Sequence, residues 1–236
     1  WFVITGLTYL ALYRTLGMDE TVYKITLMAA AANFVNVIAP SAGMGGVAVF
    51  ISEAKRNKQS TGKVTVINVL FLFIDYAAFL IVLTWGLIIL SQRNDLGPSE
   101  IIASVVMFAI AATLGSLLYL GSRSAESLGN ALAWMARLIN RIAKPFIQRD
   151  YLSETRAHEF AHKMAGDLKS LPQRYRSLIK PMLFAFAAKV LMMGILMASF
   201  LSFQVPFTLS AIVCGFAISY LFLIVSPTPS GIGIVE

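Results

Sequence analysis

Two short segments rich in proline and glycine interrupt apolar parts of the chain, at residues 39–47 and 226–236. Each reads Pro-Ser, then Gly-x-Gly, then Val or Ile. Proline lacks a backbone donor and glycine tolerates left-handed angles, so neither segment can continue a regular helix. The backbone amides freed at such a break can hold an anionic group such as a phosphate. The residues predicted to form a headgroup site here are Pro40, Ser41, Gly43, Gly45, Gly46, Pro227, Pro229, Ser230, Gly231, Gly233 and Glu236.

The duplication of this break is informative. Irregular backbone at membrane depth is tolerated only where protein or a water-filled cavity surrounds it. Paired breaks at corresponding places in two halves of a chain are typical of transporter sites. The alternative is that both segments are ordinary tight turns at the membrane surface.

Polar side chains in the apolar stretches are the second candidate group. Asp75 and Lys189 each stand near the middle of a long apolar run. A charge there costs about 2.5 to 3.5 kcal/mol, so it needs a partner or a cavity. The two residues either line a headgroup path, with or without proton coupling, or form one structural ion pair, or Lys189 reaches toward the surface. Asn33, Asn36 and Asn68 add polar groups that are suited to hydrogen bonds between helices. Asn33, Asn36, Asp75 and Lys189 are also counted among the predicted headgroup-binding residues.

Long apolar runs must position these residues. Hydrophobic residues make up 58% of the chain and charged residues only 13%, against about 25% charged in ordinary soluble domains. Four runs are long enough to cross about 30 Å of hydrocarbon as helices: residues 68–90, 101–121, 181–203 and 205–225. The sequence therefore predicts an all-α protein, a polytopic bundle of transmembrane helices with two re-entrant-like breaks.

The charges divide the chain into three parts. Residues 1–121 form an N-terminal transmembrane half, residues 122–180 a polar segment, and residues 181–236 a C-terminal half. Eleven of the 19 basic residues lie in the polar segment, and another basic cluster lies at residues 53–63, whereas residues 14–24 and 91–100 are balanced. The positive-inside rule places the two basic segments in the cytoplasm. The chain is expected to be part of a longer protein, because it begins at Trp1 inside an apolar run.

The polar segment carries two amphipathic stripes at helical spacing. The apolar positions are Leu128, Leu132, Met135, Ile139, Ile142 and Phe146, and then Ala157, Ala161, Met164, Leu168 and Leu171. These helices either lie on the inner leaflet, which we favour, or pack on each other as a hairpin. The net charge of +7 fits anionic headgroups and not nucleic acid, since no separate basic surface interleaved with aromatic residues is present.

One sequence imitates a zinc site. His158-Glu159-Phe160-Ala161-His162 has the H-E-x-x-H pattern of zinc peptidases. These are the only two histidines, and a basic residue follows the second one. A membrane-embedded zinc peptidase is therefore a minor alternative, and we expect no metal and no cofactor.

The closing segment resembles a known motif. Residues 227–236, Pro-Thr-Pro-Ser-Gly-Ile-Gly-Ile-Val-Glu, are similar to the Pro-x-Pro-Gly-Gly-x-Gly-x-x-Glu signature of the lysylphosphatidylglycerol synthase transmembrane-region family. Residues 33–46 and the basic stretch after them resemble an earlier segment of that family. Ser230 stands where the family usually has Gly, and Phe71 and Leu72 stand where it commonly has Glu-Arg. The resemblance implies an integral membrane module that flips or handles lipids.

The implied function is translocation of a phospholipid, aminoacylated or not, or of another lipid-linked headgroup. The implied location is a multi-pass protein of a bacterial or archaeal inner membrane, with membrane lipids and anionic headgroups as partners. Because the soluble synthase domain is absent from this chain, it is not expected to be an enzyme. A different class remains open, a non-catalytic membrane subunit or anchor for a lipid-modifying enzyme, and so does a homo-oligomer.

Overall fold

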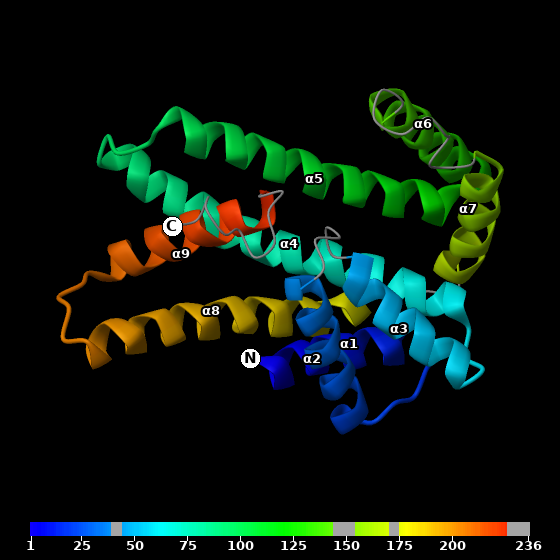
Figure 1. Cartoon of the computed structure of the whole chain (residues 1–236), viewed down its shortest axis with the longest axis horizontal. Helices are drawn as coiled ribbons and strands as arrows, with labels where there is room; N and C mark the ends of the chain where they lie inside the picture. The colour runs from blue at the N-terminus through cyan, green and yellow to red at the C-terminus, as the bar shows by residue number, and fades with distance from the viewer. Residues whose placement is uncertain (39–43, 144–153, 170–174, 226–236) are drawn as a thin grey trace.

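The computed structural model describes residues 1–38, 44–143, 154–169 and 175–225. Every regular element in these ranges is helical, which confirms the predicted all-α class (Figure 1). The elements are α1 (Phe2–Thr15), α2 (Val22–Ile38), α3 (Met44–Arg56), α4 (Thr61–Gln92), α5 (Pro98–Arg123), α6 (Ala125–Ala143), α7 (Glu154–Lys169), the short 3-10 helix η1 (Tyr175–Leu178), α8 (Ile179–Ser202) and α9 (Leu209–Val225).

Within the described ranges, three helices are long and apolar enough to cross a bilayer: α4, α5, and η1 together with α8. They match three of the four predicted runs, and the third run ends one residue beyond α8. The ends of α4 and α5 follow from their sequences, because the Ser60 side chain accepts a hydrogen bond from the backbone N–H of Lys63 and Pro98 opens α5. The 32 residues of α4 make a rod of about 48 Å, longer than the hydrocarbon core.

The fourth predicted run forms a shorter apolar helix, α9, with 17 described residues. The run was expected to begin at residue 205, but α9 begins at Leu209. Gln204 has a φ of 55°, and this left-handed residue is followed closely by Pro206. The chain therefore turns between α8 and α9 before the second helix can start.

Helices α2 and α3 form an antiparallel hairpin. Near its open end, Lys24 Nζ lies 3.5 Å from Glu53 Oε1. At the other end, the backbone N–H of Gly46 donates to Asn36 Oδ1 at 2.7 Å. The side chain of Gln59, just before α4, donates to Glu20 at 2.7 Å. The hairpin therefore starts and finishes at the same end of the molecule, so the balanced segment 14–24 lies beside the basic segment 53–63.

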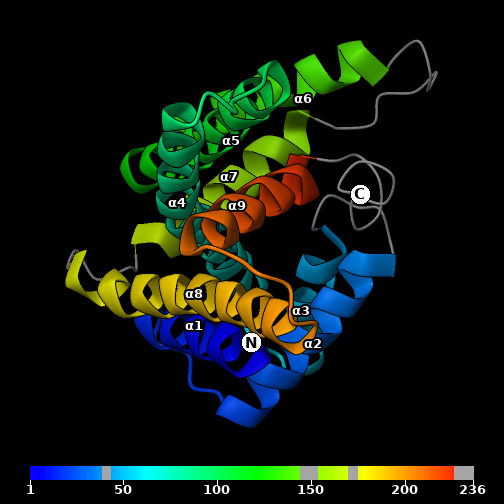
Figure 2. The ribbon, with the colours of Figure 1, turned by 90° about the vertical axis from the view of Figure 1, so that its left-hand side faces the viewer.

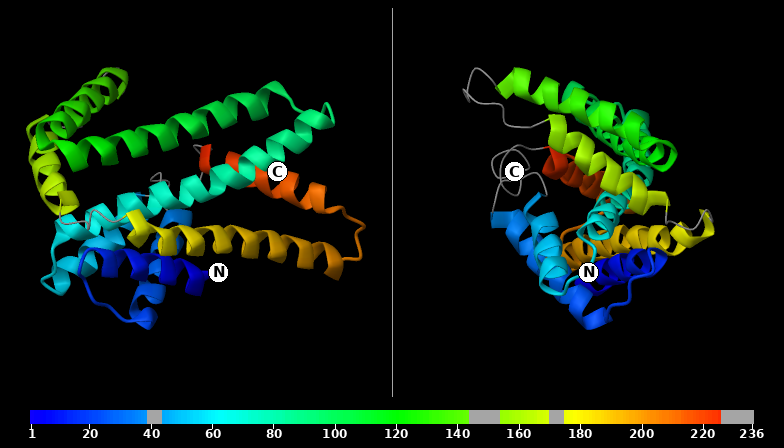
Figure 3. Two further views of the ribbon diagram at one scale, coloured as in Figure 1. Left: turned by 180° about the vertical axis from the view of Figure 1, so that it is seen from behind. Right: turned by 90° about the vertical axis from the view of Figure 1, so that its right-hand side faces the viewer.

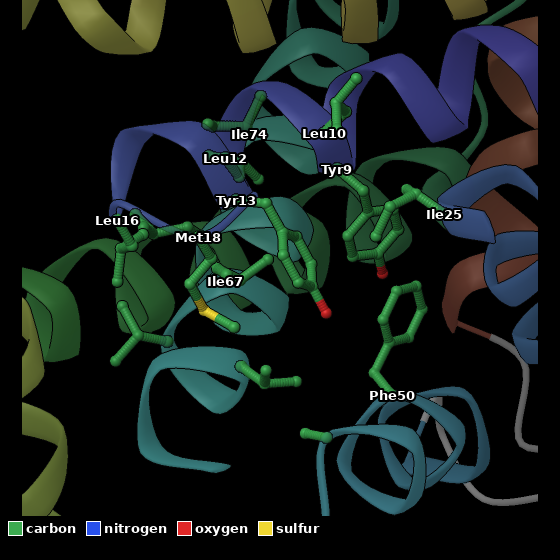
Figure 4. Close-up of a cluster of buried hydrophobic side chains, with 14 of the residues drawn as sticks. Tyr9, Leu10, Leu12, Tyr13, Leu16, Met18, Ile25, Phe50, Ile67 and Ile74 are labelled. Carbon is green, nitrogen blue, oxygen red and sulfur yellow. The ribbon is translucent and has the colours of Figure 1, made fainter. Parts of the chain in front are cut away.

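Helix α4 is the centre of the bundle and contacts α1, α3, α5, α7, α8 and α9. Figure 3 shows α4, α5, α8 and α9 running along the long axis of the molecule. One apolar core joins α1, α2, α3 and the first half of α4, through residues such as Tyr9, Ile25 and Phe50 (Figure 4). A second core joins the rest of α4 to α5 and α9, around Phe79 and Phe216.

Helices α6 and α7 pack on each other as a hairpin, and α7 also contacts α4 and α5. The sequence predicts this hairpin only as the alternative to two helices lying on the inner leaflet. Leu128 and Ala136 of α6, and Ala161 and Leu168 of α7, are buried in it. Small residues allow the close approach, since a Cβ placed on Gly129 would collide with the ring of His158. The stripe residues Leu128, Ala161, Met164 and Leu168 therefore face protein.

Large apolar side chains remain exposed along the long helices, among them Ile102, Val105, Leu183 and Ile195. Soluble monomers rarely expose continuous apolar patches of this kind. The outer surface of the bundle therefore suits lipid, in agreement with the predicted membrane class.

Candidate functional site

The two charges predicted inside the spans meet each other. Lys189 Nζ lies 2.8 Å from Asp75 Oδ1 and donates to Asp75 Oδ2 at 2.8 Å. It also donates to the hydroxyl oxygen of Tyr220 at 2.8 Å, and the Tyr220 hydroxyl donates to Asp75 Oδ2 at 3.4 Å. We call these three residues the charged triad. Of the alternatives open from the sequence, the structure shows the ion pair.

The triad joins three helices. Asp75 comes from the middle of α4, Lys189 from the middle of α8 and Tyr220 from the second half of α9. The Lys189 side chain is only 1% exposed, whereas that of Asp75 is 17% exposed. The ammonium is therefore enclosed by protein, and Asp75 is the more accessible of the two charged residues.

Aromatic rings surround the triad. Lys189 Nζ lies 4.2 Å from the centre of the Tyr220 ring, where the ring face favours a cation. Tyr220 also packs on Phe79 and Phe216, with ring centroids 4.8 Å and 5.4 Å away. These contacts fix the Tyr220 ring and with it the position of the ammonium.

A second polar group lies nearer to the α2–α3 hairpin. The Tyr9 ring is stacked between Phe50 and Phe71, with centroids 4.4 Å and 3.9 Å away. Its hydroxyl donates to Asn68 Oδ1 at 3.3 Å, and the Asn68 amide donates to the Val64 carbonyl at 2.8 Å. Figure 4 shows Tyr9 and Phe50 facing each other across the space between α1 and the hairpin. Asn68 thus makes the interhelical hydrogen bond that its sequence position predicts.

The described part of the first Pro-Gly segment closes the α2–α3 hairpin. Asn36 accepts the N–H of Gly46, and a Cβ on Gly46 would come within 2.6 Å of the Asn36 amide nitrogen. Asn33 lies half-buried on the preceding turn of α2. Because glycine at position 46 has no Cβ, α2 and α3 can approach each other closely there. A site made of backbone amides needs such a close approach.

Most of the predicted headgroup site lies outside the described residues. These positions are Pro40, Ser41, Gly43, Pro227, Pro229, Ser230, Gly231, Gly233 and Glu236. The predicted meeting of the two Pro-Gly segments is therefore untested and stays a prediction. The site residues that the structure brings together are Asp75 with Lys189, and Asn36 with Gly46.

Ion pairs hold the open end of the hairpin. Lys24 Nζ lies 2.8 Å from Glu20 and 3.5 Å from Glu53. The hydrogen bond to Glu20 raises the pKa of Lys24. The Glu53 carboxylate accepts the side-chain amide of Asn57 at 2.6 Å, and this bond, followed by the charge of Lys24, lowers the pKa of Glu53.

The H-E-x-x-H sequence lies on α7, in the hairpin with α6. His162 is exposed, while His158 packs against Gly129. Within the described ranges, no group of three or more His, Cys, Asp or Glu side chains is placed to hold a metal ion. The peptidase alternative therefore lacks a third ligand among these residues.

The whole chain, residues 1–236, matches the family described as the lysylphosphatidylglycerol synthase TM region. The chain belongs to that family. Comparison with curated proteins and with solved structures found no match. The resemblance seen in the closing motif is thus confirmed over the full length.

In this member of the lysylphosphatidylglycerol synthase TM-region family, two residues of the site were not predicted from the sequence: Tyr220 and Tyr9. Both are tyrosines inside apolar runs, where a hydroxyl needs a hydrogen-bond partner. The need of each buried hydroxyl for a hydrogen-bond partner is the signal by which the two tyrosines could have been predicted. Phe71, at the position where Glu is common in the family, fills the aromatic stack on Tyr9.

Proposed function

We propose that this protein moves a phospholipid headgroup across the membrane through a polar path in its interior. The observation that carries the proposal is the charged triad, which joins three packed apolar helices and in which the Asp75 side chain is 17% exposed. Charges that are kept inside apolar spans usually mark a substrate or ion pathway. Family membership makes a lipid the favoured substrate.

The path has two further polar groups. The Tyr9–Asn68 pair and the Asn36–Gly46 contact lie on the side of the α2–α3 hairpin. Tyr9 and Asn68 are buried, so a headgroup would exchange hydrogen bonds with this pair only when the helices around it separate, while its acyl chains stay against the apolar outer faces of the helices. Asp75, the more accessible charge of the triad, would attract the amino group of an aminoacylated or zwitterionic lipid, and the enclosed Lys189 would hold the Asp75 carboxylate in place.

The proposed setting is a bacterial or archaeal inner membrane, with the basic ends of the helices in the cytoplasm. The proposed role is transport without chemistry on the lipid, so the chain itself is not an enzyme. Anionic phospholipids are the proposed partners.

The test is lipid transfer in proteoliposomes. Vesicles contain phosphatidylglycerol labelled on an acyl chain with a fluorophore that dithionite bleaches from outside only. With the wild-type protein, bleaching should pass the half that corresponds to the outer leaflet. The double variant Asp75→Asn/Lys189→Met should stop at that half, whereas Thr113→Ala, an exposed position on α5, should behave as wild type.

Two results would refute the proposal. One is wild-type protein that transfers neither phosphatidylglycerol nor its lysyl ester. The other is a folded double variant that transfers lipid at the wild-type rate.

A further inference from the structure

Among the described residues, α6 packs on α7 and α5, and its outer face is left exposed. Its inner face, with Leu128, Ala133 and Ala136, is buried. Its outer face carries Trp134, 60% exposed, and Leu138, 42% exposed. Arg141 is exposed on the same side, since residues three and four apart share one face of a helix. We call Trp134, Leu138 and Arg141 the α6 stripe.

The direction of α6 follows from one residue. Ser124 has an extended backbone, with φ −151° and ψ 126°, which ends α5 after Arg123. Its hydroxyl oxygen accepts the N–H of Ser127 at 3.2 Å and so begins α6. Figure 2, viewed along the long axis, shows α6 projecting sideways past α4 and α5. Because α5 runs across the membrane, α6 runs close to the membrane plane.

The depth of α6 is marked at the end of α5. Tyr119 is 59% exposed, and the Arg123 guanidinium lies 5.4 Å from the centre of its ring. Exposed tyrosines beside basic residues are typical of the membrane–water interface. Arg123, the last residue of α5, follows four residues after Tyr119, a rise of about 6 Å along the helix, and α6 begins two residues later at Ala125. The start of α6 is therefore at the level of the headgroups.

The chemistry of the stripe fits an anionic lipid surface better than a protein groove. A tryptophan and a leucine supply a narrow apolar edge, and arginine stands beside them, as in helices that lie in the interface. The net charge of +7 adds general attraction to anionic headgroups. We propose that the α6 stripe inserts into the headgroup region of the adjoining leaflet and binds anionic phospholipid there.

The proposal is tested by depth-dependent quenching of Trp134. The chain has three tryptophans, so Trp1→Phe/Trp85→Phe leaves Trp134 as the sole emitter. In proteoliposomes, lipids brominated near the headgroup end of the acyl chain should quench Trp134 more than lipids brominated near the chain terminus. Trp85, 57% exposed on α4, serves as the lipid-facing control in a Trp1→Phe/Trp134→Phe variant.

A second part of the experiment tests whether the α6 stripe prefers anionic lipid. Brominated phosphatidylglycerol should quench Trp134 more than brominated phosphatidylcholine does at equal content. Arg141→Gln should reduce the ratio of quenching by phosphatidylglycerol to quenching by phosphatidylcholine, by up to about fivefold. This factor corresponds to the contribution of one basic residue near an anionic surface, up to about 1 kcal/mol. Arg93→Gln, an exposed charge change at the far end of the molecule, should leave the ratio unchanged.

Each other outcome would overturn the proposal. Trp134 that is open to aqueous iodide and not quenched by lipid means a solvated face. Trp134 that is shielded from both quenchers means a protein occupant, either a second copy or another chain. Should the tryptophan variants fold poorly, a spin label on Leu138→Cys in a Cys214→Ala background reads the same depth through its accessibility to oxygen and to a soluble nickel chelate.

Discussion

Removing one member of the charged triad should cost far more stability than removing both charges. In Asp75→Asn, the Lys189 ammonium, 1% exposed, loses its counter-charge and keeps only Tyr220 and a weaker amide acceptor. Breaking a buried ion pair from one side costs about 3–5 kcal/mol. For a chain of this size that corresponds to a fall in unfolding temperature of roughly 6–20 °C. Lys189→Met should cost a similar amount, because it leaves the carboxylate without a counter-charge and with only the Tyr220 hydroxyl as a partner.

The double variant Asp75→Asn/Lys189→Met should lie within about 1–2 kcal/mol of wild type, because a neutral pair replaces the ion pair. The assay is a double-mutant cycle on purified protein in one detergent, with unfolding followed by loss of the monodisperse chromatographic peak on heating. Single variants that each lose only a degree or two, and whose effects add in the double variant, would show that the two charges are not coupled and would refute the reasoning.

Three further changes test the packing and the hairpin. Gly86→Leu should cost about 1–3 kcal/mol, because a Cβ there would lie 2.8 Å from a side chain of α9; the same change at Gly194, which has open space, should leave the unfolding temperature nearly unchanged. Tyr9→Leu should cost about 2–4 kcal/mol through loss of the aromatic stack, and Tyr9→Phe only about 1 kcal/mol, in the same thermal assay. The lowered pKa of Glu53, caused chiefly by its bond to Asn57, contributes stability that is complete above the ordinary pKa of Glu and is lost as the pH falls through the lowered value. Glu53→Gln should therefore flatten the dependence of the unfolding temperature on pH at the acidic end, and an unchanged slope would contradict this.

The apolar runs of the sequence predict most of the fold because length and lack of charge decide whether a helix can cross a membrane. The runs that became α4, α5 and α8 illustrate this. The stripes at Leu128 and Ala161 likewise predict α6 and α7, but both arrangements of these helices bury an apolar stripe equally well. Periodicity shows that a face is apolar and does not show what covers it.

The hairpin and the triad show where such prediction stops. Asn36 and Gly46 lie ten residues apart, and their types indicate a break, yet only the antiparallel return of α3 brings them into contact. Asp75 and Lys189 stand out because each charge lies alone in an apolar run. Tyr220 does not stand out, because a tyrosine ring fits an apolar run and only its hydroxyl needs a hydrogen-bond partner. Because the α2–α3 hairpin starts and finishes at the same end of the molecule, it adds no net crossing of the membrane. Counting α2 alone as a span would therefore reverse the assigned orientation of every later helix.

The ion pair between α4 and α8 has a consequence for how the protein is made. Asp75 leaves the ribosome 114 residues before Lys189, which at roughly 5–20 residues per second is a delay of about 6–23 seconds. During that interval the nascent α4 carries a carboxylate with no ammonium to meet it. Leaving that carboxylate alone in the lipid would cost about 2.5–3.5 kcal/mol, which favours keeping the nascent α4 beside the insertion machinery until α8 has been made.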